Sequence, residues 1–162
     1  MIHEVEGDIC LTRAQVLAHG VASNDPMNQG LALSLHERYP AMHKDFHHWC
    51  HQAHPKSGEA WIWGGVDNVR IVNLITQEGG YDGTKPGKAT LPNVNHALRE
   101  LKKIVNQEGF KSLALPRLAT GVGGLSWDAV RPLIDAQLGD LDIDIYLYTV
   151  FHADQQASEP GL

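Results

Sequence analysis

The chain has little of what marks a secreted, disulfide-stabilised or membrane-spanning protein. Its 162 residues include only two cysteines, Cys10 and Cys50, which supply neither a disulfide framework nor the paired spacing of a zinc site. No apolar run approaches the roughly 20 residues that cross a bilayer, and the short acidic start at residues 2–6 has no signal-peptide character. These absences favour a reducing compartment, cytoplasmic or nuclear, and we expect a cytoplasmic protein without membrane contacts.

Positive charge is also scarce. The chain has 13 lysines and arginines against 19 acidic residues, a formal net charge of -6, which argues against non-specific binding to nucleic acid or to an anionic membrane. An anionic ligand can still bind through backbone amides, which carry no net charge. Hydrophobic residues make up 43% and charged residues 20%, which is typical of a globular protein, and the length favours a single domain.

Two common nucleotide-binding motifs are missing. The P-loop pattern fails because Asp82 stands where its first glycine would precede Gly87-Lys88. The dinucleotide fingerprint fails because residues 121–126 lack its last glycine and lie near the end of the chain rather than in its first strand-helix unit. The sequence therefore supports neither a P-loop NTPase nor a Rossmann dehydrogenase.

Hydrophobic patterning alternates between strands and helices along the chain. This alternation predicts an α/β fold of three layers, in which a mixed, mainly parallel sheet is flanked by helices. We expect the domain to span residues 1–151 and residues 152–162 to form a polar, disordered tail. The expected strands are 2–6, 16–22, 60–63 paired as a hairpin with 69–76, 112–115 and 143–150; the expected helices are 31–38, 42–54, 92–105 and 127–138, with a short helical turn at 11–15.

A glycine-rich stretch, residues 115–127, joins an apolar strand to an amphipathic helix. A strand that turns through glycines into a helix N-terminus suits an anion site, although the same glycines are compatible with a plain tight turn. Three other segments also follow strands: Gly7-Asp8-Ile9, residues 23–30, and the long loop after Thr76. Because ligands of such folds bind at the carboxyl ends of the strands, the four segments are expected to line one cleft. Asp8 could accept a hydrogen bond from an exocyclic amine there, or cap the turn at 11–15.

Together these segments resemble the macrodomain family. The resemblance rests on Glu6-Gly7-Asp8-Ile9, on His19 through Gly30-Leu31-Ala32, on Leu74-Ile75-Thr76, and on Leu115-Pro116-Arg117 to Trp127, and it covers roughly residues 1–151. It is strongest to the branch that includes ADP-ribosyl glycohydrolases and an ADP-ribose-1″-phosphate phosphatase. The resemblance implies a macrodomain-like fold that binds ADP-ribose or an ADP-ribosylated substrate, and we expect a monomer without cofactor or metal.

The resemblance also implies binding residues. Asp8, with the Ile9 backbone beside it, would hydrogen-bond the adenine amine. Phe151, or else Tyr148, would flank the adenine; the alternative is that this side chain belongs to the core. The residues around the distal ribose and its phosphate would be Ser23, Gly30, Leu31 and Ala32, and those wrapping the diphosphate would be Thr120, Gly121, Val122, Gly123, Gly124 and Leu125.

The match departs from the family at the catalytic positions. Where the related glycohydrolases have a nucleophilic lysine the chain has Gln77, which cannot form a Schiff base, and where one has an aspartate the chain has Gly123. Lys85 and Lys88 lie further along the loop and either fold back or are solvated.

The related phosphatase lacks both groups as well, and its suggested catalytic histidine matches His19. We therefore consider His19 as a general acid or base with Asp82 as partner; the alternatives are a hydrogen-bonded core histidine and a solvated turn residue. The favoured function is a hydrolase acting on an ADP-ribosyl derivative. The alternatives are a non-catalytic ADP-ribose reader or scavenger and a generic nucleotide-binding module.

Five of the ten histidines fall between residues 43 and 54. Histidines at helical spacing can chelate a metal, but no glutamate accompanies them and no third ligand is evident, so a solvated polar face is the preferred interpretation. One side of the helix holds His43, His47, His51 and His54, and the side expected to face the core holds Met42, Phe46, Trp49, Cys50 and Ala53.

Overall fold

A six-stranded sheet forms the centre of the molecule in the computed structural model, which describes all residues 1–162. The strand order is β1-β6-β5-β2-β4-β3, and every neighbouring pair is parallel except β3 and β4. The mixed, mainly parallel sheet and the predicted hairpin are both confirmed. The strands are β1 (Ile2–Gly7), β2 (Val16–Ala22), β3 (Ala60–Gly64), β4 (Arg70–Gln77), β5 (Ser112–Leu115) and β6 (Asp144–Phe151).

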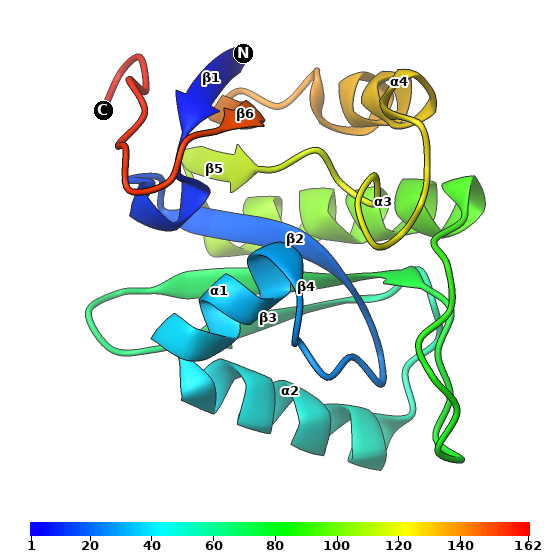
Figure 1. Ribbon diagram of the computed structural model, residues 1–162. Helices are drawn as coiled ribbons and strands as arrows, with labels where there is room; N and C mark the ends of the chain where they lie inside the picture. Colours follow the sequence, from blue (N-terminus) through cyan, green and yellow to red (C-terminus); the bar gives the residue numbers. More distant parts are fainter.

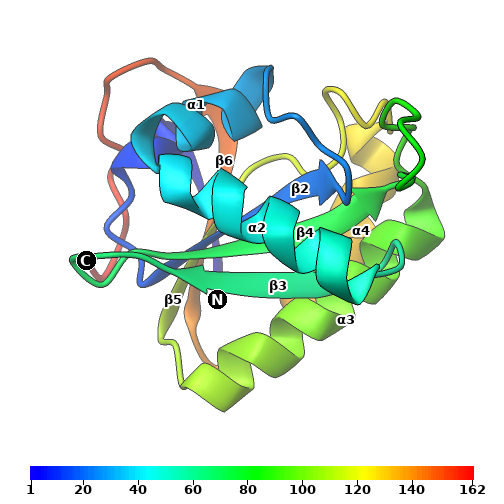
Figure 2. The same ribbon diagram turned by 90° about the horizontal axis from the view of Figure 1, so that it is seen from below.

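Two helices cover each face of this sheet, which confirms the three-layer architecture. Helices α1 (Gly30–Arg38) and α2 (Pro40–Ala53) lie on one face, and α3 (Leu91–Glu108) and α4 (Trp127–Leu138) lie on the other (Figures 1 and 2). Because strand side chains alternate, β2 sends Ala18 into the core beneath α3 and α4 and sends Leu17 and Val21 into the core beneath α1 and α2. None of the helices combines the length and the hydrophobicity of a membrane-spanning segment.

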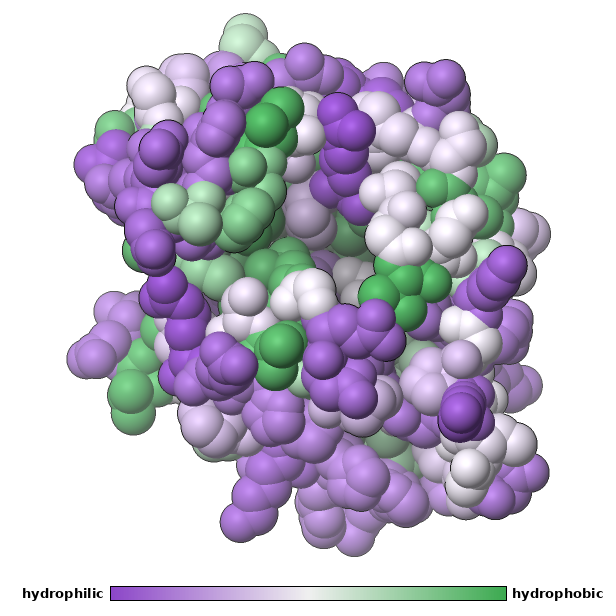
Figure 3. Space-filling view, viewed as in Figure 1, coloured by the Kyte–Doolittle hydropathy of each residue, from purple (hydrophilic) through white to green (hydrophobic).

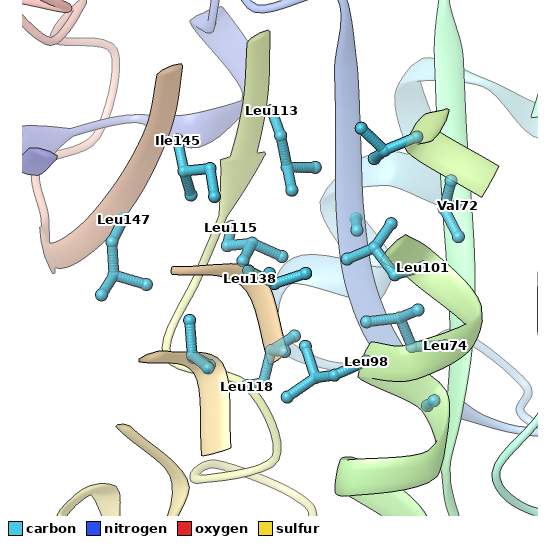
Figure 4. Packing of buried hydrophobic residues seen from close by; sticks show 14 of the residues in the cluster. Val72, Leu74, Leu98, Leu101, Leu113, Leu115, Leu118, Leu138, Ile145 and Leu147 are labelled. Carbon is cyan, nitrogen blue, oxygen red and sulfur yellow. The ribbon is translucent and has the colours of Figure 1, made fainter. Parts of the chain in front are cut away.

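Helix α3 shows how local sequence fixes an element. The Thr90 side chain accepts a hydrogen bond from the Asn93 N–H at the start, and Gly109 ends the helix with a φ of 70°. The predicted core face is confirmed, because Val94, Leu98, Leu101 and Val105 are all buried. Figure 4 shows Leu98 and Leu101 packed with side chains of the sheet and of α4, at a gain of roughly 1.5–3 kcal/mol for each fully buried leucine.

The histidine-rich helix α2 only partly follows its prediction. Met42, Phe46 and Cys50 are buried as expected, but Ala53 at the end of the helix is exposed. The predicted polar face is solvated, because His47, His51 and His54 are exposed, while His43 is half-buried. Neighbouring rings also contact one another: the ring of His36 in α1 stacks on that of His43 at 4.1 Å, and the His47 ring is tilted against that of His51 at 4.4 Å. No group of three or more histidine, cysteine or acidic side chains is arranged to hold a metal ion.

Two predictions near the chain ends are wrong. The short helical turn is a 3-10 helix, η1 (Ile9–Leu11), rather than residues 11–15, because the Asp8 carboxylate accepts the Cys10 N–H and starts the turn earlier. The segment after β6 is ordered rather than disordered. It packs against β1 and η1, with Ala157 and Glu159 buried, because Glu159 finds hydrogen-bond donors on the body of the domain (Figure 1).

Candidate functional site

A cleft lies at the carboxyl ends of the parallel strands. It consists of two adjoining chambers of about 830 Å³ and 620 Å³, which share the lining residues Gly30, Leu31, Pro116, Tyr148 and Phe151. The larger chamber follows β2, β4 and β5, and the smaller one follows β1 and β6. Figure 3 shows a hollow in this face of the molecule with hydrophobic residues along its walls.

The first turn of α1 opens onto the larger chamber. Gly30 lies in the left-handed region with a φ of 60°, and the first backbone bond of the helix runs from the Leu33 N–H to the Gln29 carbonyl. The N–H groups of Gly30, Leu31 and Ala32 therefore have no partner within the helix, and all three residues line the chamber. Free N–H groups at the positive end of a helix dipole form an anion site.

The glycine-rich loop forms another wall of the larger chamber, but with fewer residues than expected. Thr120, Gly121, Val122 and Gly123 line it. Gly124 and Leu125 do not line it, because they turn the chain back toward α4. The Gly124 N–H donates to the Gly121 carbonyl at 3.1 Å and the Leu125 N–H to the Ala119 carbonyl at 2.9 Å.

Gly123 has no space for a side chain. An added Cβ would lie 2.7 Å from the Ala119 carbonyl oxygen and 3.0 Å from the Ala89 Cβ. A carboxylate at this position would therefore require the loop to move. Gly121 differs, because a Cβ there meets no atom within 4 Å.

The smaller chamber combines a carboxylate with an exposed aromatic ring. Asp8 and Ile9 line it, and Phe151 stands at the border of both chambers with 68% of its surface exposed. Phe151 is therefore not a core residue. Tyr148 is, because it is 6% exposed and its hydroxyl donates to Glu159. Ser34, Glu37 and Arg38 also line this chamber and were not predicted.

His19 lies in the lining of the larger chamber at the centre of the sheet, with 1% of its surface exposed. It is paired across the sheet with Asn73 of β4, and its Nε2 is 2.5 Å from the Asn73 Oδ1. The Asn73 Nδ2 faces the Met42 sulfur at 3.5 Å, so the amide oxygen is the acceptor and the His19 Nε2–H is the donor.

This tautomer leaves the His19 Nδ1 unprotonated, and that buried atom has no hydrogen-bond partner. Burial lowers the pKa of His19 to about 4, so the ring is neutral near pH 7. A neutral ring of this tautomer can accept a hydrogen bond at Nδ1, but the buried atom has no surface open to a ligand. The ring has no acidic proton to deliver, which argues against a general-acid role.

Besides Gly124 and Leu125, two more predicted site residues lie outside the cleft lining. Ser23 is buried beneath the loop after β4, where a Cβ on Gly79 would lie 2.7 Å from its hydroxyl oxygen. Asp82 is exposed near the tip of that loop, and its hydrogen bonds with Thr84 lower the pKa of its carboxyl. The carboxylate that lines the chamber with His19 is Asp25, which accepts the N–H groups of Ala22 and Met27.

The loop after β4 is tied down at several points. The Gln77 side-chain Nε2 donates to the Gly87 carbonyl at 2.9 Å, and the Tyr81 hydroxyl donates to the Pro55 carbonyl at 2.9 Å. Gln77 and Lys85 line the larger chamber, with the exposed Lys85 at its edge. The side chain at position 77 is therefore an amide that anchors the loop.

Sequence reasoning missed Asp25 and Asn73. The turn formers at residues 23–26 were a signal for Asp25, because an aspartate there can accept nearby backbone N–H groups. Nothing in the sequence points to Asn73. It lies 54 residues from His19, and only the register of β2 against β4 brings the two side chains together.

Comparison with known proteins gives one family and several relatives. The family model described as Macro domain matches residues 18–134. A DNA ADP-ribosyl glycohydrolase from Mycobacterium tuberculosis is 29% identical over 152 residues, which cover 90% of this chain and 42% of that protein. An ADP-ribose glycohydrolase from Homo sapiens is 25% identical over 147 residues, which cover 90% of each chain.

Among solved structures, Thermosipho africanus DarTG in complex with ADP-ribose aligns with a TM-score of 0.80 at 23% identity. The alignment covers 96% of this chain and 42% of that one, and the likeness concerns the fold alone. The chain thus spans about two-fifths of the length of the mycobacterial relative and nine-tenths of the human one.

Proposed function

The chain belongs to the macro domain family, and from this premise we propose that its cleft binds ADP-ribose or an ADP-ribosyl derivative and hydrolyses the derivative. The observation that carries the proposal is the continuity of the two chambers. One presents unpaired helix N–H groups and a glycine loop, and the other presents a carboxylate beside an exposed aromatic ring. A diphosphate and an adenine are complementary to these two chambers in that order.

Each part of the ligand has a proposed place in this cleft. The adenine stacks on Phe151 with its amine on Asp8, beside the Ile9 backbone. The diphosphate lies between the first turn of α1 and residues 120–123. The distal ribose then extends toward His19, Gln77 and Lys85, which line the larger chamber and not the smaller one.

The proposed chemistry is hydrolysis without a covalent lysine intermediate. Gln77 cannot form a Schiff base, and its side-chain amide is engaged with Gly87. His19 contributes an unprotonated but buried Nδ1, so we propose that it acts through an internal water molecule that orients the attacking water or a ribose hydroxyl. The proposed substrates are ADP-ribose-1″-phosphate, which would make the chain a phosphatase, and an ADP-ribosylated acceptor.

A non-catalytic reader or scavenger of ADP-ribose is the second candidate. It is favoured by Gln77, by Gly123 and by the low pKa of His19, because together they leave the cleft without a strong nucleophile or acid. The names of the relatives favour hydrolysis, since both are glycohydrolases. We also propose that the chain is a monomer and that it is cytoplasmic. Analytical ultracentrifugation tests the monomeric state, and imaging of the tagged chain tests the location.

Calorimetry followed by turnover assays separates these candidates. We expect ADP-ribose to bind at least about tenfold more tightly than ADP, a difference of about 1.4 kcal/mol, because only ADP-ribose has a distal ribose to place beside His19, Gln77 and Lys85. Equal affinities would instead indicate a generic nucleotide-binding module, and no binding of ADP-ribose would contradict the proposal.

Turnover is then measured with ADP-ribose-1″-phosphate, ADP-ribosylated protein and ADP-ribosylated DNA. We expect His19→Ala to bind ADP-ribose and to lose turnover. Tight binding without turnover of any of the three substrates would identify the reader.

A further inference from the structure

The segment after β6, residues 152–162, is named here the C-terminal strap. It leaves the sheet at Phe151 and runs back along β1 and η1 (Figure 1), outside the residues 18–134 that match the family. We propose that the strap is a positioning and specificity element of the smaller chamber: it fixes Asp8 so that the chamber selects a base with an exocyclic amine over one with a carbonyl. This inference rests on the proposed binding of ADP-ribose.

The strap touches Asp8 directly on both its backbone and its side chain. The Asp154 N–H donates to the Asp8 Oδ2 at 3.1 Å, and the Asp8 N–H donates to the Gln155 carbonyl at 2.7 Å. The Cys10 N–H donates to the other carboxylate oxygen, Oδ1, at 3.0 Å. Both oxygens of Asp8 are therefore oriented by backbone N–H groups, and one of the two donors belongs to the strap.

The strap also forms part of the chamber wall, because Ala153 and Asp154 line it together with Asp8. A carboxylate is an acceptor only, and each oxygen has a second lone pair. A carboxylate held in one orientation accepts an amine N–H from the base edge. A carbonyl at the same place on the base would put its oxygen next to the Asp8 carboxylate oxygen. Both atoms are acceptors, so neither would have a hydrogen-bond donor, which is unfavourable in a buried site.

A buried carboxylate anchors the far end of the strap to the domain. Glu159 is 3% exposed, and its Oε2 accepts hydrogen bonds from the Thr12 hydroxyl at 2.5 Å and from the Tyr148 hydroxyl at 2.9 Å. Its Oε1 accepts the Arg13 N–H at 2.8 Å. Removing this side chain leaves the Thr12 hydroxyl, the Arg13 N–H and the Tyr148 hydroxyl without their partner, so the strap loses three hydrogen bonds to the domain.

The residue before Asp8 is adapted to the strap. Gly7 has a φ of 152°, and a Cβ there would lie 2.8 Å from the Gln155 carbonyl oxygen and 2.9 Å from the Ala157 nitrogen. Only glycine lets the strap lie this close to the end of β1. Strap and chamber are thus packed as one unit, with Asp8 between them.

Glu159→Ala in the full chain tests the proposal, with Gln156→Ala as the matched control. Gln156 is exposed in the same segment and makes one side-chain bond, to the Leu11 carbonyl at 3.2 Å. The probes are ADP-ribose and its hypoxanthine analogue, which replaces the amine by a carbonyl, each measured by calorimetry. We expect the wild type to prefer ADP-ribose at least about tenfold, Glu159→Ala to lose most of this preference, and Gln156→Ala to keep it.

Two further variants keep the test informative if Glu159→Ala does not fold. Glu159→Gln retains the size of the side chain, and Gly7→Ala displaces the strap from the other side. A folded variant with lowered thermal stability and an unchanged preference would overturn the proposal, since a purely structural strap behaves in that way. A wild type that binds both probes equally would also overturn it, whereas a wild type that binds neither contradicts the proposed function itself.

Discussion

At the scale of single residues, Gly121 and Gly123 of the loop that lines the larger chamber differ in the space around them. Gly123 is enclosed by the Ala119 backbone and by Ala89, so even a methyl group meets atoms at 2.7–3.0 Å. Gly121 faces open space within the cleft. Gly123 therefore shapes the loop, and Gly121 leaves room where the diphosphate is proposed to lie.

We predict that Gly121→Glu lowers the affinity for ADP-ribose at least about tenfold, because it adds negative charge beside the diphosphate. Its unfolding free energy should stay within about 0.5 kcal/mol of the wild type, since the site is open. Gly123→Ala should instead destabilise the fold by about 1–3 kcal/mol through overpacking. Calorimetry and urea denaturation measure the two effects.

Gly121→Ala is the control, because it adds a methyl group without charge. Unchanged affinity in Gly121→Glu would remove this loop from the proposed binding site. Gly123→Glu should also weaken binding strongly. Because it both distorts the loop and adds negative charge, this variant alone does not distinguish the two effects.

At the scale of elements, the loop after β4 is a fixed wall of the cleft. The Glu78 N–H donates to the Lys88 carbonyl and the Gly87 N–H to the Glu78 carbonyl, while the Gln77 side chain holds the Gly87 carbonyl. The aromatic ring of Tyr81 lies 4.2 Å from that of His54 and ties the loop to the end of α2. Because the loop is held at these points, Lys85 and Pro86 line the larger chamber in a fixed position.

We predict that Gln77→Ala loosens this loop without unfolding the domain. Loss of one hydrogen bond of about 1 kcal/mol should speed hydrogen exchange of the Glu78 and Gly87 amides by about fivefold. Exchange followed by NMR measures this change. Gln137→Ala removes a comparable side-chain bond, to Asn95 between α4 and α3, and should leave both amides unaffected. Equal protection in Gln77→Ala and the wild type would show that other contacts hold the loop.

At the scale of the whole molecule, the sheet carries a buried polar pair at its centre, and this pair makes stability depend on pH. The His19 ring is neutral in the native state because burial lowers its pKa from 6.5 to about 4. In the unfolded chain the ring is solvated and titrates near its ordinary value. Burial likewise lowers the pKa of His43, so its contribution has the same sign.

We predict that the unfolding free energy is insensitive to His19 above about pH 6.5 and falls as the pH drops toward 4. In that window the unfolded chain binds a proton that the native ring does not bind, which costs up to about 3 kcal/mol. Urea denaturation at pH 7 and pH 4.5 measures the change. His19→Asn should flatten the dependence more than His43→Asn does, and an equal slope in the wild type and His19→Asn would contradict the burial argument.

Local sequence determined the elements and their order. Strands 16–22 and 112–115 and helix 127–138 have the bounds that patterning predicted, and the apolar face of α3 is the buried one. These features follow from side-chain periodicity, turn residues and caps within a few positions of each other. The same order places the loops that follow the strands at one edge of the sheet, so most of the residues predicted for the site do line the cleft.

The tertiary structure alone decided the details of the site. It brought Asn73 to His19, placed Asp25 rather than Asp82 in the chamber, and left Phe151 exposed at the border of both chambers. It also folded the polar end of the chain against Asp8. The physical reason is common to all of these features: each is a contact between segments distant in the chain. Strand register and loop packing set such contacts, and no local pattern of residues encodes them.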